Sequence, residues 1–141
     1  MAFIPNVHPV TILIILAAHW FGLYSLLPIY VFVMIEGFLY GFHIWWVCYL
    51  YVWAILAIII TVIRKYGSTV VYTIVAAIFG ILFGTLCSIP YFITGGFGYG
   101  VSWIISGLSY DMIHMISNTV SVALLFYPLN TALERSKVAK L

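Results

Sequence analysis

Three ionisable residues, Glu36, Asp111 and His114, lie inside long apolar stretches of a chain that has only five basic and three acidic side chains. A charge at the centre of a bilayer costs about 2.5–3.5 kcal/mol on insertion scales, so such groups usually face a protein interior or a cavity. The remaining charged residues occupy a short loop at 64–65 and the C-terminal stretch 134–140, where water can reach them. Binding or proton-transfer chemistry is therefore expected around the three buried groups.

Each acidic residue in the apolar stretches belongs to a polar stripe with helical spacing. Positions i, i+3 or i+4, and i+7 fall on one face of an α-helix. The two stripes consist of Glu36, Tyr40 and His43, and of Asp111, His114 and Asn118. In an otherwise apolar bundle, polar stripes can satisfy one another only by facing inward. We therefore expect Glu36 and Asp111 to face a common hollow near the outer side of the membrane.

The composition places the chain in a lipid bilayer. Hydrophobic residues make up 66% of the sequence, charged residues 6%, and the mean hydropathy is +1.24, whereas soluble proteins contain about 25% charged residues. The apolar stretches are continuous and do not alternate with period two, which favours helices over the strands of a barrel. The small net charge of +2 comes from the loop and the tail, so nucleic acid is not an expected partner.

Five apolar segments follow one another along the chain, which predicts an all-α, polytopic transmembrane bundle with five spans in one domain, residues 1–141. The segments cover residues 10–27, 28–42, 46–63, 69–93 and 101–133. Residues 94–100 are rich in glycine and are expected to form a loop. The last segment exceeds one span of about 20 residues. Part of it is expected either to lie at the outer surface or to break near Gly107.

The basic residues predict the topology. Cytoplasmic loops of membrane proteins carry an excess of Lys and Arg, so the 64–65 loop and the C-terminus are expected in the cytoplasm, with loop 94–100 outside. Residues 3–9 have the composition of a loop between helices. This suggests that a first helix is missing from the sequence.

Aromatic residues concentrate around the two turns expected on the outer side. Part of this set fits an interfacial belt, where Trp and Tyr anchor helices at the level of the headgroups. The excess on one side favours stacking on a flat ligand. Cys48 and Cys87 match no metal-ligand spacing and are expected to be small core residues. The spacing of Gly80 and Gly84 favours close helix packing within the bundle.

The sequence resembles the substrate-binding S components of energy-coupling factor (ECF) transporters. The resembling stretches are the N-terminal loop at 3–7 and residues 31–42, 45–53, 79–84 and 87–91. The last helix also matches, through the run Ser106-Gly107-Leu108-Ser109-Tyr110-Asp111-Met112-Ile113-His114, Asn118, Tyr127-Pro128-Leu129 and a basic tail. The similarity covers nearly the whole chain, although its motifs are diffuse. The chain shows five spans where that family has six, and the absent helix is the first.

The resemblance implies a function and partners. An S component is a multi-pass protein of the bacterial plasma membrane that binds a vitamin or related micronutrient from outside with high affinity. It delivers this substrate to a module of one transmembrane coupling protein and two ATPases. ATP is used by those partners, so the chain itself is expected to be neither an enzyme nor a cofactor carrier. The ligand would lie in the outer half, under the loop after the first helix and among the last helices.

The residues expected to hold the ligand fall into three groups. Aromatic residues surround a planar ligand, polar residues on the last helix orient it, and the N-terminal loop covers it, while Glu36 and Tyr40 either contact the ligand or brace the last helix. The set comprises Asn6, His8, Glu36, Tyr40, Trp46, Tyr49, Trp53, Tyr91, Asp111, His114 and Asn118.

Two other functions remain open from the sequence. Glu36, His43, Asp111 and His114 could hold a metal ion in a small intramembrane hydrolase. Alternatively, Glu36 and Asp111 could relay protons in an ion-conducting or proton-conducting oligomer. The residues themselves do not identify the substrate.

Overall fold

The computed structural model describes residues 9–136, and within this range every regular element is a helix. The all-α prediction is confirmed for the described part of the chain. The elements are α1 (Val10–Phe21), the 3₁₀-helix η1 (Gly22–Ser25), α2 (Leu26–Tyr40), α3 (Ile44–Ile63), the 3₁₀-helix η2 (Arg64–Tyr66), α4 (Thr69–Cys87) and α5 (Ile89–Arg135).

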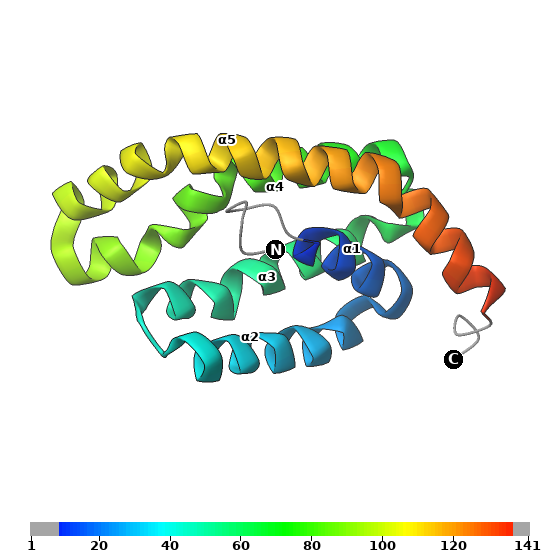
Figure 1. Cartoon of the computed structure of the whole chain (residues 1–141), viewed down its shortest axis with the longest axis horizontal. Helices are drawn as coiled ribbons and strands as arrows, with labels where there is room; N and C mark the ends of the chain where they lie inside the picture. Colours follow the sequence, from blue (N-terminus) through cyan, green and yellow to red (C-terminus); the bar gives the residue numbers. More distant parts are fainter. Residues whose placement is uncertain (1–8, 137–141) are drawn as a thin grey trace.

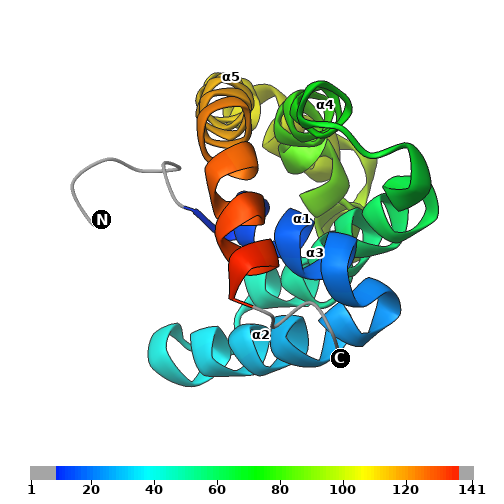
Figure 2. The same cartoon turned by 90° about the vertical axis from the view of Figure 1, so that its right-hand side faces the viewer.

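The helices form three layers; α4 and α5 run along the long axis of the molecule, whereas α2 crosses it obliquely (Figures 1 and 2). α4 and α5 make one outer layer, α1 and α3 the middle layer, and α2 the other outer layer (Figures 1 and 2). The contact between α4 and α5 is the most extensive of the fold, whereas α2 packs mainly on α3. The arrangement therefore separates α2 from α5 by the thickness of the middle layer.

Two glycines with positive φ reverse the chain at the same end of the bundle. Gly41, with φ of 93°, ends α2, and Gly96, with φ of 76°, turns the chain inside α5. A side chain at such φ values would be strained, which glycine avoids. Residues 89–95 continue the direction of α4, and residues 97–135 return alongside it (Figure 1).

The expected loop at 94–100 is wrong in extent. Both sides of Gly96 are helical, and Gly96 is the single residue inside α5 with non-helical dihedral angles. The expected break near Gly107 is also absent, because Gly107 is helical.

Four stretches are long and apolar enough to cross a membrane: Val10–Tyr40, Ile44–Tyr66, Thr69–Cys87 and Ile89–Arg135. This supports a membrane protein, but five spans are not confirmed. The first stretch is a hairpin of α1 and α2 (Figure 1). At 1.5 Å per residue these helices rise only about 18 and about 22 Å, less than the ~30 Å hydrocarbon core.

Glycine brings the backbones of α4 and α5 close together. A Cβ atom built on Gly80 would lie 2.7 Å from the Cα atom of Met115 on α5. Small residues at such positions allow close approach of transmembrane helices, as the Gly80 and Gly84 spacing predicted. This contact sets the register of α5 on α4, and with it the positions of Asp111 and His114.

The end of the bundle opposite to the Gly41 and Gly96 turns carries basic residues. Arg64 lies beside Gly22, since a Cβ atom there would be 2.8 Å from the Arg64 guanidinium. His19 near the end of α1 is within electrostatic reach of both Arg64 and Glu134. The loop at 64–65 and the C-terminal end of α5 therefore lie at one end of the molecule, on the right in Figure 1.

A partly buried hydrogen bond near this end offers a test of the packing of α1 on α4. Nδ1 of His19 lies 2.7 Å from the hydroxyl of Tyr72, which is fully buried. We expect Tyr72→Phe to lower the free energy of unfolding by about 1 kcal/mol, since a polar partner is left unpaired. Unfolding in mixed micelles measures the change. Tyr24→Phe, on an exposed tyrosine, is the matched control, and equal stability of the two variants would contradict the contact.

Candidate functional site

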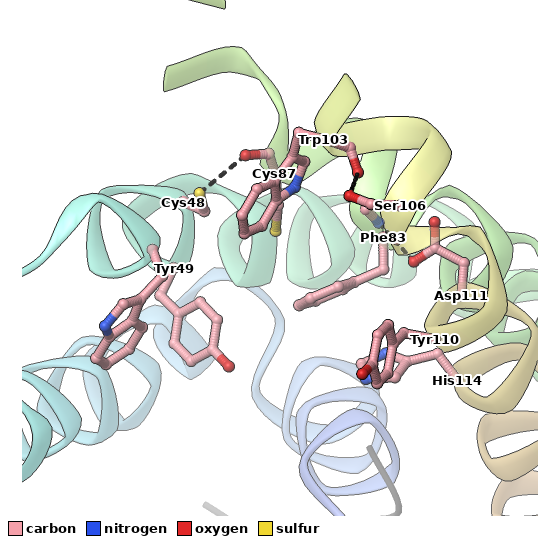
Figure 3. A pocket seen from close by; sticks show the side chains of 12 residues that line it. Cys48, Tyr49, Phe83, Cys87, Trp103, Ser106, Tyr110, Asp111 and His114 are labelled. Atoms are coloured by element: carbon pink, nitrogen blue, oxygen red, sulfur yellow. Dashed lines mark hydrogen bonds between the residues drawn. The ribbon is translucent and has the colours of Figure 1, made fainter. Parts of the chain in front are cut away.

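A cavity of about 490 Å³ opens among α3, α4 and α5. It lies toward the end of the bundle that contains the Gly41 and Gly96 turns, because its walls come from the start of α3, the end of α4 and the first half of the returning part of α5 (Figure 1). Its walls are formed by Trp45, Cys48, Tyr49, Phe83, Gly84, Cys87, Trp103, Ser106, Gly107, Tyr110, Asp111 and His114 (Figure 3).

Asp111 places a carboxylate in the wall, held by the backbone of α4. Its side chain is only 4% exposed, and Oδ1 accepts a hydrogen bond of 2.8 Å from the backbone N–H of Gly84. A Cβ atom on residue 84 would lie 2.5 Å from Oδ2, so only glycine leaves room for the carboxylate here. Gly84 thus donates the hydrogen bond to Asp111 and, because it has no side chain, also leaves room for the Asp111 carboxylate.

His114 lies one helical turn beyond Asp111 on the same face of α5. It too is 4% exposed, and its ring packs against Phe83 on α4, with ring centroids 4.6 Å apart. The imidazole and the carboxylate are therefore presented together from one side of the cavity (Figure 3).

Aromatic rings line the opposite wall. Tyr49 on α3 faces Tyr110 and His114 across the open space (Figure 3). The Tyr49 ring packs edge-on against Trp45 at 5.2 Å. Trp103 completes the wall near the Gly96 turn. The cavity therefore combines flat apolar surfaces with a carboxylate and an imidazole, a combination typical of small-molecule sites.

Cys48 and Cys87 are both buried, both free, and both part of this wall. The Cys48 thiol donates to the backbone carbonyl of Cys87 at 3.0 Å, which ties α3 to α4. The prediction that they are small buried residues agrees with this placement. Their position beside the cavity was not predicted.

Of the residues expected to hold a ligand, Tyr49, Asp111 and His114 line the cavity. Trp53 and Tyr91 do not line the cavity but pack behind residues that do. Trp53 is buried against Tyr49 at 5.5 Å, and Tyr91 stacks on Trp103 with ring centroids 3.7 Å apart. These two rings support wall residues and do not form the wall.

Trp46 and Asn118 are also outside the wall. The indole nitrogen of Trp46 donates to the backbone carbonyl of Val33 at 2.8 Å, so this side chain joins α3 to α2. Asn118 is buried on α5, and its amide nitrogen has no hydrogen-bond partner among residues 9–136. Asn6 and His8 fall outside the described residues.

The expectation that Glu36 and Asp111 face one hollow is wrong in this structure. Glu36 is half-buried on α2, within electrostatic reach of the Tyr49 hydroxyl, but it does not line the cavity. Tyr40, at 66% exposure, and the exposed His43 point elsewhere. The physical reason is the layer order, in which α2 packs on α3 and not on α5.

Several wall residues were missed by the sequence analysis, although the pattern could have found them. Trp103, Ser106, Gly107 and Tyr110 extend the stripe of Asp111 toward the Gly96 turn at steps of three and four residues. The same spacing joins the wall positions on α3 and α4. Extending the stripe in both directions would have predicted this face of α5.

The structure does not assemble the metal site considered above. Among residues 9–136, no three His, Cys, Asp or Glu side chains come together in a way that could hold a metal ion. The described geometry therefore gives the metal-dependent hydrolase no support.

Comparison of the chain with protein families, with curated proteins and with solved structures finds no match.

Proposed function

We propose that this chain is the substrate-binding membrane subunit of an ECF-type importer for a vitamin or related micronutrient. The observation that carries the proposal is the cavity of about 490 Å³ with aromatic walls, in which Asp111 and His114 are buried side by side. The volume falls within the ~300–1,000 Å³ typical of ligand pockets. A buried carboxylate beside an imidazole is costly in an apolar bundle, and ionisable groups in such places usually mark a functional site.

The place of the cavity supports uptake from outside. The basic residues at 64–65 and 135 lie at the opposite end of the bundle. By the positive-inside rule that end is cytoplasmic, with the C-terminus, and the cavity then lies in the outer half of the bilayer. A binding subunit in a bacterial plasma membrane would collect its substrate from this side.

The proposed partners follow from the same function. A coupling protein in the membrane and two ATPase subunits would supply the energy, so the chain itself would bind substrate without hydrolysing ATP. The sequence resemblance supports this part of the proposal.

Thiol labelling tests which side of the membrane the cavity faces. We expect a membrane-impermeant methanethiosulfonate to modify Cys87 in intact cells and not in inside-out vesicles. Cys48→Ser and Cys87→Ser variants show which of the two thiols is labelled. Labelling of Cys87 in inside-out vesicles alone would contradict the proposed orientation.

Transport provides the functional test. Small molecules released from the purified protein are identified by mass spectrometry, and the identified compound is then supplied to cells producing the chain with or without an energy-coupling module. Accumulation that requires the module supports the proposal. Accumulation without it, or proton flux into liposomes containing the chain alone, would instead favour the conducting oligomer.

A further inference from the structure

We propose that the ligand of this cavity is a planar molecule with a cationic, nitrogen-containing edge that binds Asp111. The inference rests on the proposed function and names the chemical class of its substrate. Three observations carry it: the unbalanced carboxylate, the aromatic walls and the size of the space.

No Lys or Arg in the wall balances the Asp111 carboxylate, and the only basic side chain there is the imidazole of His114 on the same face of α5. Its hydrogen bond comes from the neutral N–H of Gly84, and the cavity wall contains neither Lys nor Arg. The basic residues at 64–65 and 135 lie at the far end of the bundle (Figure 1). A buried carboxylate is unfavourable unless it is paired. A ligand that brings a charged N–H donor supplies a cationic partner.

The aromatic walls select the same class of ligand. Tyr49 on α3 faces Tyr110 on α5 across the space (Figure 3), and Trp45 on α3 also lines it. Aromatic faces attract cations, with a gain of about 0.5–2 kcal/mol when the pair is desolvated. A flat cationic ring system can therefore stack on these faces while its edge reaches Asp111.

The size of the cavity sets the scale of the ligand. At about 490 Å³, the space accommodates a fused bicyclic ring with a short substituent. An anionic ligand would place its charge near Asp111 with no Lys or Arg in the wall to balance it, which like-charge repulsion disfavours.

A set of three isosteric probes tests the charge preference. 2-Naphthamidine is cationic, 2-naphthamide is neutral and 2-naphthoate is anionic, and all three share one flat shape. Calorimetry on ligand-free protein in detergent measures their affinities. We expect the amidine to bind at least about fivefold more tightly than the amide, since a hydrogen bond to a charged partner is worth about 1 kcal/mol more than a neutral one.

Asp111→Asn should remove that preference without disturbing the fold. The Asn carbonyl can still accept from the Gly84 N–H, and only the charge is lost. Glu134→Gln is the matched control, because this carboxylate lies at the opposite end of α5. The control should retain the full preference for the amidine.

The outcomes separate this inference from the function on which it rests. Equal or tighter binding of the amide or naphthoate overturns the inference, as does an amidine preference that survives in Asp111→Asn. Failure of all three probes overturns it as well. If a small molecule still co-purifies with the protein in these cases, the binding-subunit function stands. If no small molecule co-purifies with the protein, the results contradict both the inference and the proposed function.

Discussion

Replacing Gly107 by Phe should weaken binding of the co-purified ligand by at least about 100-fold, equivalent to a loss of about 2.7 kcal/mol. Gly107 lines the cavity, and a Cβ atom there has no neighbour within 4 Å. The added ring would fill space that the ligand needs, and its Cβ atom would meet no protein atom. The helix itself should tolerate the change, since Gly is the weaker helix former.

Gly98→Phe provides the matched control for the blocked cavity. Gly98 also lies in α5 and also has open space around its Cβ position, but it is exposed and does not line the cavity. Equilibrium dialysis should give wild-type affinity for this variant. If Gly107→Phe also bound the ligand normally, the ligand would have to occupy another part of the molecule.

A leucine at Gly80 should cost about 3 kcal/mol of stability, at the upper end of the range for overpacking. The obstacle is backbone, because the Cα and N atoms of Met115 would both lie 2.7 Å from the new Cβ atom. Backbone atoms cannot rotate away as a side chain does, so α4 and α5 must separate. Asp111 would then move away from Gly84, and ligand binding should fall with stability.

Thermal unfolding in detergent, followed by tryptophan fluorescence, measures this loss. Gly98→Leu adds the same side chain at a position with open space and should leave stability within about 0.5 kcal/mol of wild type. Equal stability of the Gly80 and Gly98 variants would show that the close contact of α4 and α5 is not required.

The apolar composition predicted the helical architecture, but not the extent of the helices. Residues 94–100 contain several glycines, a pattern that favours loops in water. In the structure the chain keeps its helical hydrogen bonds on both sides and reverses at Gly96 alone, where glycine permits the φ of 76°. Counting glycines does not show which of them forms the turn, because the others are helical.

The stripe of Asp111 and His114 predicted one wall of the cavity, because helical periodicity determines which residues share a face. It could not predict what that face contacts. Glu36 belongs to the same kind of stripe on α2. Because α2 packs on α3, the Glu36 side chain does not line the cavity. The aromatic residues show the same limit, since composition does not distinguish Tyr49 in the wall from Trp53 directly behind it.

An experimental density map of the purified, ligand-bound protein tests the central claim most directly. We expect density for one small, flat molecule between Tyr49 and Tyr110, with a polar atom within hydrogen-bond distance of the Asp111 carboxylate. A lipid chain in that space, or side chains collapsed into it while a ligand binds elsewhere, would contradict the assignment of this cavity as the substrate site.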